Sequence, residues 1–225
     1  MITLYRPSGY DSPRASSFAG RSVDDKPLDA ENGSLFKEID TGRVFRYDKE
    51  NNLWIEQKNT TGGGGATEPY IEETYDADGN LIEAKLYGYT KIRDNLYVGC
   101  TNLAHVSFSE SLTSIGESAF NSCSNLALTS LPAGVTSIGS GAFNSCSNLA
   151  LTSLPAGVTS IGSYAFSGCT RLTSITFKGT PTIIESSAFD GCTNLTDIKV
   201  PWAEGAVSGA PWGATNATIT YNYTE

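Results

Sequence analysis

The sequence predicts a mainly β protein whose larger part is a short solenoid, a stack of similar coils. Five cysteines stand at positions 100, 123, 146, 169 and 192, each 23 residues after the last. The segments that begin at Cys123 and Cys146 differ at only three positions. A fixed period of this size indicates one supersecondary unit stacked on copies of itself. We therefore expect the function to lie on the faces of this stack and in whatever precedes it.

Apolar residues recur within each repeat. Counted from the cysteine, they stand at positions 1, 4, 6 or 7, 9, 13, 16, 20 and 21. Positions 4, 7 and 9 predict a short strand whose alternate side chains enter the core, and VTSIG predicts a second short extended piece. GSxAF predicts one turn of helix whose Ala and Phe close the coil. The inward residues of the first full repeat are Cys100, Leu103, Val106, Phe108, Leu112, Ile115, Ala119 and Phe120.

The pattern CxxLxxIxFxxxVTSIGxxAFxxC resembles the BspA-like leucine-rich repeats of bacterial and protist surface proteins, over residues 86–225. The resemblance implies a leucine-rich-repeat solenoid with 23-residue repeats, parallel short strands and one helical turn in each repeat. It also implies an adhesive or surface-displayed protein, because the family is mostly known in those roles.

Composition excludes two classes of function. The 225 residues carry a formal net charge of −9 at pH 7, and only five residues after position 85 are basic. Nucleic-acid binding needs clustered Lys and Arg, so no polynucleotide partner is expected. No run of 18 apolar residues occurs, so no membrane insertion is expected. The first residues lack the basic start and apolar run of a secretory signal, so we expect no Sec export.

The cysteines are spaced too widely for zinc, which needs close pairs such as CxxC. Stacked coils place equivalent Cα atoms about 4.8 Å apart. Parallel Cβ vectors then keep the Cβ atoms at about that distance, beyond the roughly 3.8 Å of a disulfide. We expect a ladder of buried free thiols, each acting as a small hydrophobe.

The N-terminal part is organised differently. Residues 1–23 are rich in Ser, Gly, Pro and Arg without periodicity, which predicts an extended tail, either disordered or ordered against a partner. Residues 24–58 hold three short alternating runs separated by DTGR and DKENN, which predict a small β-meander. Residues 59–69 contain four consecutive glycines and predict a flexible linker.

The segments MITLYRPSG, PRASSFAG and GSLFKEIDTGRVFRYDKENNLW resemble the N-terminal module of virion structural proteins from tailed bacteriophages, over residues 1–58. In that family such segments attach an exposed domain to the particle. The resemblance implies that residues 1–58 bind other virion proteins. The candidate particle-docking residues are Leu4, Tyr5, Arg6, Arg14, Phe18, Phe36, Tyr47 and Trp54.

Both ends of the solenoid are expected to be capped. Residues 70–99 predict an N-terminal cap, made of a hairpin that turns at Asp76 to Asn80 and a degenerate half-repeat. DADGN lacks the glycine and glutamate spacing of an EF-hand loop, so we expect a plain turn. The repeats span residues 100–200. Residues 201–225 predict a C-terminal cap in which Trp202 and Trp212 cover the last coil.

No motif points to catalysis. GxGxxG, P-loop, GxSxG and HExxH patterns do not occur. His105 is the only histidine, and Ser107 and Glu110 follow it, but a triad needs a nucleophile and a base that converge in a cleft. We therefore expect no enzyme, no cofactor and no metal site.

Outward positions of the first strand predict a ligand face. No charged residue occurs from Ser118 to Thr170, and a Ser, Thr and Asn surface suits glycan or protein recognition. The alternative is that near-identical repeats record a recent duplication and carry no site. Leu128 and Leu151 fall at an outward position, where either the strand bulges and turns them inward or they form an apolar stripe. The candidate ligand-face residues are His105, Ser107, Leu128, Ser130, Leu151, Ser153, Ser174, Thr176, Asp197 and Lys199.

The two resemblances together predict a phage virion structural protein, made in the host cytoplasm. Its N-terminus would anchor to the particle, and its solenoid would be displayed outward to bind a host-surface protein or glycan. Self-association on the particle is left open. The alternatives are a bacterial cell-surface adhesin of the BspA-like class and a ligand-free decoration or spacer protein.

Overall fold

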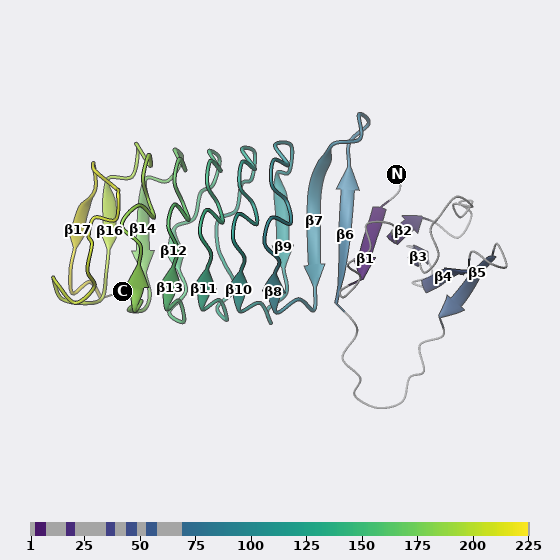
Figure 1. Cartoon of the computed structure of the whole chain (residues 1–225), viewed down its shortest axis with the longest axis horizontal. Helices are drawn as coiled ribbons and strands as arrows, with labels where there is room; N and C mark the ends of the chain where they lie inside the picture. Colours follow the sequence, from purple (N-terminus) through teal and green to yellow (C-terminus); the bar gives the residue numbers. More distant parts are fainter. Residues whose placement is uncertain are drawn as a thin grey trace, which may run out of the picture. The chain divides into compact units, whose positions relative to one another are not determined.

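The computed structural model describes residues 69–224, apart from the side chain of Tyr70, together with the backbone of five short strands before them. The chain divides into two compact units, Met1–Gly88 and Tyr89–Glu225. All the regular elements of the described residues are β-strands, and no helix occurs among them (Figure 1).

The first unit contains a β-sheet with the strand order β5-β4-β3-β2-β1-β6-β7. β3, β4 and β5 pair antiparallel in succession, which confirms the predicted meander. β6 and β7 form the predicted hairpin, and the Asp76 carboxylate closes its turn by accepting hydrogen bonds from the N–H groups of Asp78 and Asn80. The strands are β1 (Thr3–Pro7), β2 (Ser17–Gly20), β3 (Leu35–Glu38), β4 (Val44–Asp48), β5 (Leu53–Gln57), β6 (Tyr70–Tyr75) and β7 (Leu81–Tyr87).

Part of the predicted tail lies in this sheet. β1 pairs antiparallel with β6, with Leu4 opposite Glu73, and β2 pairs with both β1 and β3. Pairing with a strand edge satisfies the backbone groups of an extended segment, so residues without periodicity of their own can still join a sheet. The β6–β7 hairpin therefore groups with the first unit, whereas the sequence grouped it with the repeats. Its role as a cap stays a prediction.

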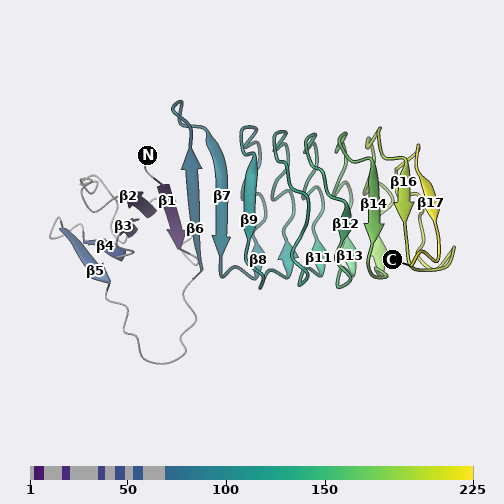
Figure 2. The ribbon, with the colours of Figure 1, turned by 180° about the vertical axis from the view of Figure 1, so that it is seen from behind.

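The second unit is the predicted solenoid, and Figures 1 and 2 show its stacked coils from opposite sides. Coils one to five are numbered here from Cys100, Cys123, Cys146, Cys169 and Cys192. One parallel sheet, with the order β15-β13-β11-β10-β8, is centred on the VTSIG segments, and another has the order β12-β14-β16-β17. The strands are β8 (Lys91–Ile92), β9 (His105–Phe108), β10 (Ser114–Ile115), β11 (Ser137–Ile138), β12 (Ser153–Leu154), β13 (Ser160–Ile161), β14 (Ser174–Phe177), β15 (Ile183–Ile184), β16 (Asp197–Lys199) and β17 (Thr218–Thr220).

A continuous stack of aromatic rings runs through the core of the coils. Tyr97, Phe120, Phe143, Phe166 and Phe189 follow one another with ring centroids 5.2 to 5.6 Å apart, and none is more than 2% exposed. The planes of successive phenylalanines differ by only 6° to 9°. The inward assignment of the Ala-Phe pair is therefore confirmed, because one ring from each coil contacts the rings above and below it.

The segment predicted as one turn of helix is instead a run of tight turns. Ser118 and Gly141, at equivalent positions, have φ angles of 52° and 60°, in the left-handed region. The N–H groups of Ser118 and Phe120 donate to the carbonyls of Ser140 and Ala142 in the next coil, each at 2.8 Å. In a helix these amides would bond along the helix axis to the residue four positions back. Bonding between coils replaces that pattern, and the sequence of a single repeat does not reveal it.

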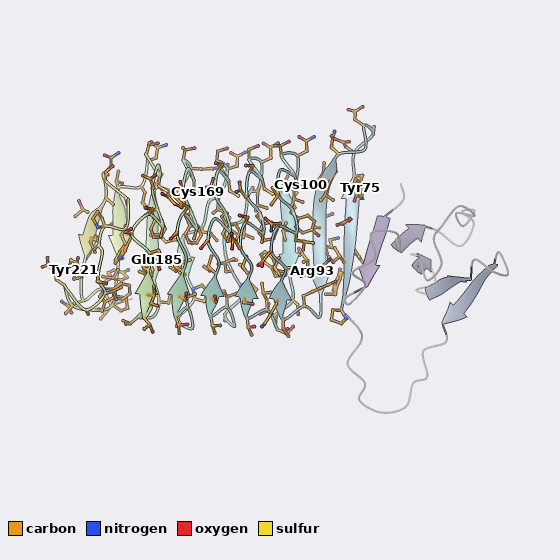
Figure 3. All side chains as sticks on the ribbon, in the orientation of Figure 1. Tyr75, Arg93, Cys100, Cys169, Glu185 and Tyr221 are labelled. Atoms are coloured by element: carbon orange, nitrogen blue, oxygen red, sulfur yellow. The ribbon has the colours of Figure 1, made fainter. Side chains whose placement is uncertain are left out.

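The cysteines form the predicted ladder of free thiols. Each of the four buried thiols donates to the backbone carbonyl of the residue 26 positions earlier, at 3.0 to 3.1 Å. Burial raises the pKa of Cys146 to about 12 and that of Cys192 to about 11. Cys100, at the start of the ladder, is half-buried, and Figure 3 labels it in the same row as Cys169. The donor and acceptor pairs are Cys123 to Tyr97, Cys146 to Phe120, Cys169 to Phe143 and Cys192 to Phe166.

We expect the four buried thiols to react slowly with Ellman's reagent in the native protein. Reaction requires the thiolate, which burial disfavours at neutral pH. Cys100 should react first, because it is half-buried rather than buried. After denaturation without reductant, all five thiols should be counted. A lower count would show that a disulfide had formed and that the Cβ geometry of the ladder was misjudged.

Coils two and three differ from the others at the first strand. Leu151 is only 2% exposed, and Leu128 is half-buried. The N–H of Ala150 donates to the carbonyl of Leu128, whereas the equivalent Ala127 donates to Ala104, so the backbone register slips by one residue between these coils. The slip lets the segment LTSL place Leu151 and Leu154 in the core. The predicted inward orientation of Leu151 is therefore confirmed. Leu151 is accordingly withdrawn from the candidate ligand face.

The C-terminal segment covers the end of the coil stack as predicted. Trp212 is fully buried and Trp202 is 6% exposed. Their rings lie 6.0 Å and 5.3 Å from the ring of Phe177 in coil four. The Trp212 carbonyl also accepts a 2.9 Å bond from Phe189 N–H, which continues the pattern of bonds between coils. The two indoles therefore bury the last apolar surface of the solenoid.

Candidate ligand-binding face

The sheet β12-β14-β16-β17 aligns polar side chains from successive coils on its outer side. The isoleucines that alternate with them on β14 and β16 are at most 1% exposed, so the polar side chains point away from the core. Parallel strands lie about 4.8 Å apart, which gives these rows a regular spacing. We call this surface the outer face. Its two rows are Ser174, Asp197 and Thr218, and Ser153, Thr176, Lys199 and Thr220.

An ion pair and an aromatic ring stand near the C-terminal end of the outer face. Lys199 Nζ lies 3.5 Å from Asp197 Oδ2, and their side chains are 36% and 37% exposed. The same nitrogen lies 5.2 Å from the centroid of the half-buried Tyr223 ring. An ion pair this exposed contributes less than about 1 kcal/mol to stability. Lys199 and Asp197 can therefore pair with an external ligand with little loss of folding stability.

The structure brings together only some of the predicted ligand-face residues. Ser153, Ser174, Thr176, Asp197 and Lys199 share the outer face through the strand register. The remaining residues lie on earlier coils. His105 and Ser107 are exposed on β9 of coil one, Ser130 is exposed and Leu128 half-buried in coil two, and neither residue of coil two lies in a strand.

Three residues of this face were missed by the sequence analysis. Thr218 and Thr220 lie opposite Asp197 and Lys199, and Tyr223 contacts the Lys199 ammonium. The alternation of TIT around Ile219 is the signal that marks the two threonines as outward. The contact of Tyr223 depends on the chain turning back after β17 and has no signature in the sequence.

The candidate particle-docking residues belong to the first unit of the chain. Arg14 lies outside the described residues. The other seven lie on β1 to β5, where the structure describes the backbone alone. Their role stays a prediction. These seven are Leu4, Tyr5, Arg6, Phe18, Phe36, Tyr47 and Trp54.

The described residues contain neither a metal-binding cluster nor a membrane-spanning helix. Within residues 69–224, no three side chains among His, Cys, Asp and Glu gather closely enough to hold a metal ion. In the described part of the chain, no helix has the length and apolar character to cross a membrane.

The chain is similar to solved structures of leucine-rich repeat proteins. Similar solved structures include a leucine-rich repeat protein of T. pallidum, 24% identical with a TM-score of 0.38, which covers 57% of this chain and 80% of its own. A leucine-rich repeat protein from Bacteroides ovatus is 22% identical with a TM-score of 0.45, over 70% of this chain and 45% of its own. A leucine-rich cell surface protein from Faecalibacterium prausnitzii is 19% identical with a TM-score of 0.29, over 64% and 71%. No curated protein matches the chain.

The chain also matches a known protein family. The BspA type leucine-rich repeat region matches in six copies over residues 87–204. The match lies outside residues 1–58, so the resemblance of that segment to phage virion modules stays a prediction. The matched residues make up more than half of the 225-residue chain and contain all the coils of the aromatic stack. The chain therefore belongs to the BspA-type leucine-rich repeat family.

Proposed function

We propose that this chain is a binding protein without enzymatic activity, and that its outer face recognises a protein or a glycan. One observation carries the proposal: the strand register lines up hydroxyls of β12, β14 and β17 with the lysine and carboxylate of β16 on one side of the sheet, and the Tyr223 ring lies beside that lysine. A flat array of donors and acceptors fixed at regular spacing can hydrogen-bond an extended ligand at several points. Fixed side chains also lose little entropy on binding.

The chemistry of the outer face favours an extended neutral or weakly charged ligand. Its hydroxyls donate and accept hydrogen bonds, as sugars and peptide backbones require. Tyr223 adds an apolar ring, and Lys199 adds one cation beside the Asp197 carboxylate. Because the two charges are paired, a strongly charged small molecule gains little net attraction from this face.

We expect the double variant Ser174→Glu/Thr220→Glu to bind its ligand at least tenfold more weakly than the parent. Both side chains are exposed on the outer face, so the new carboxylates add charge and bulk at the contact without entering the core. Binding of the full chain to immobilised mucin, to a glycan array and to intact bacterial cells would be measured. Ser140→Glu, exposed on the corner of coil two, is the control.

Two results would count against this proposal. Equal binding by the double variant and the control would move the site away from the outer face. Absence of binding by the parent to all three probes would favour the alternative of a ligand-free decoration or spacer protein.

We also propose that residues 1–58 attach the repeats to a larger particle, by their resemblance to phage virion modules, with a bacterial cell-surface adhesin as the alternative. The full chain should be incorporated into virions, and a fragment that begins at Tyr70 should be left in solution. A cooperative melt of that fragment would show that it is folded. Incorporation of the fragment to the same extent as the full chain would place the anchor in the solenoid and contradict this proposal.

A further inference from the structure

The corner between coils three and four departs from the rest of the stack. Coils two and three have the same sequence except for three positions, all at this corner, where Gly141, Asn144 and Ser145 are replaced by Tyr164, Ser167 and Gly168. Tyr164 is 49% exposed, one of the few large apolar side chains in the described residues that are so open. An otherwise unchanged repeat has thus gained a solvent-facing aromatic ring at one place.

The backbone at Tyr164 is unfavourable for this side chain. Its φ angle is 57°, and the equivalent Gly141 has a φ of 60°. A left-handed conformation is strained for a residue with a Cβ atom, whereas glycine adopts it freely. The equivalent Asn95 and Ser118 share this conformation, with φ angles of 58° and 52°, so the fold sets the backbone and Tyr164 differs by its large side chain.

One hydrogen bond between coils is also missing here. At the equivalent position of other coils, the N–H groups of Asn95, Ser118 and Gly141 each donate to a carbonyl of the following coil at 2.8 Å. In the part of the chain that the structure describes, the Tyr164 N–H makes no such bond to Ser186. The backbone N–H of Tyr164 could therefore donate a hydrogen bond to a partner at this corner.

Coil four also differs in sequence next to this corner. Glu185 stands where coils one to three have glycine, at Gly116, Gly139 and Gly162. A Cβ atom added to Gly162 would lie 2.6 Å from the backbone nitrogen of Ser140, so a side chain at this position presses on the preceding coil. Glu185 carries such a side chain, and the bond from the Tyr164 N–H to the next coil is absent at the same corner. The N–H of Glu185 still donates to the Ile161 carbonyl at 3.1 Å, so the two coils stay in register.

Ile183 adds a second open apolar side chain beside Glu185. It is 51% exposed, at a position that holds Ser114, Ser137 and Ser160 in the preceding coils. Ile184 between them is 6% exposed, whereas Ile183 and Glu185 on either side of it are exposed. Glu185, labelled in Figure 3, directly follows β15 and stands two residues after Ile183.

The charge of this corner has a single sign. In the VTSIG and corner segments of coils three and four, residues 158–168 and 181–191, the charged residues are Glu185 and Asp190 alone. Both are exposed, and neither forms an ion pair within the described residues. A partner with positive charge would therefore be attracted here, and one with negative charge repelled.

We propose that Tyr164, Ile183 and Glu185 form a second docking surface, for a protein segment that presents a basic side chain next to an apolar one. The basic group would pair with Glu185 and lie over the Tyr164 ring, which attracts cations. The apolar side chain would cover Ile183, and a backbone carbonyl of the partner would accept the unused N–H of Tyr164. This surface lies beside the sheet of β15 and not on the outer face, so it is independent of the ligand proposed above.

Substituting each of these residues by the one that an equivalent coil carries tests this proposal without disturbing the core. Tyr164→Gly, Ile183→Ser and Glu185→Gly each install the residue that an equivalent coil already carries. Full-length ¹⁵N-labelled protein would be titrated with acetyl-Gly-Arg-Leu-Arg-Gly-amide and with the same peptide carrying Glu in place of Arg, and amide shifts would be followed by NMR. Ser140→Ala, on the exposed corner of coil two, is the control.

The arginine peptide should give saturable shifts at Tyr164, Ile183 and Glu185, and the glutamate peptide should give none. The affinity should fall at least tenfold in Tyr164→Gly and Glu185→Gly and stay unchanged in the control. The Tm of Tyr164→Gly should equal or exceed that of the parent, which a purely structural tyrosine would not allow. Equal shifts with both peptides, no saturable shift at this corner, or unchanged affinity in both variants would overturn the proposal.

Discussion

Phe143→Ala is expected to lower the free energy of unfolding by about 3–5 kcal/mol, because it removes a buried ring and leaves a cavity. Phe143 is fully buried in a middle coil, with the rings of Phe120 and Phe166 stacked at 5.4 and 5.6 Å on its two sides. The stability of a solenoid is close to a sum of coil and neighbour terms. Loss of this ring therefore weakens one coil and both of its interfaces. Urea denaturation followed by circular dichroism measures the change.

The matched control for this substitution is Ser140→Ala, in the same coil. Ser140 is exposed, and its carbonyl, not its side chain, bonds to Ser118 N–H. The free energy of unfolding of Ser140→Ala should stay within about 0.5 kcal/mol of the parent value, as is usual for a surface substitution. Similar urea midpoints for Phe143→Ala and Ser140→Ala would contradict the inference that the aromatic stack stabilises the solenoid.

Trp212→Ala is expected to lower the free energy of unfolding by about 3–5 kcal/mol and to destabilise mainly the C-terminal coil. The indole is fully buried, and its N–H donates to the Ser208 carbonyl at 2.8 Å. It also packs on Phe177 and Trp202, with ring centroids 6.0 and 6.4 Å away. Because coils contact only their neighbours, the loss should be greatest at this end and small near coil one.

Hydrogen exchange followed by mass spectrometry resolves this gradient along the chain. Peptides that contain β16 and β17 should exchange faster in Trp212→Ala, whereas those from coils one and two should be unchanged. Thr220→Ala, exposed on β17, is the control and should leave the exchange of both regions at the level of the parent. Uniformly faster exchange in Trp212→Ala would show that the solenoid unfolds as one unit and not coil by coil.

The candidate outer face could be located only in part from the sequence. Outward positions of each strand follow from the repeat register, and this placed Ser174 and Lys199 correctly on one side of the sheet. Leu151 shares the register position of Ser174 but is buried, because the backbone register slips by one residue at this point between coils two and three. The slip is decided by packing between neighbouring coils, so the pattern of one repeat left both outcomes open.

The sequence by itself determined the stacked coils, the inward Ala-Phe pairs and the ladder of free thiols. Each follows from side-chain identity at a fixed period, since residues that recur every 23 positions occupy the same place in every coil. Only the tertiary structure decided the tight turns at the corners, the pairing of β1 with β6, and the strained Tyr164. These features depend on backbone hydrogen bonds and close approaches between segments in different coils or distant strands. Such bonds involve groups that every residue carries, so they leave no mark in the amino-acid sequence.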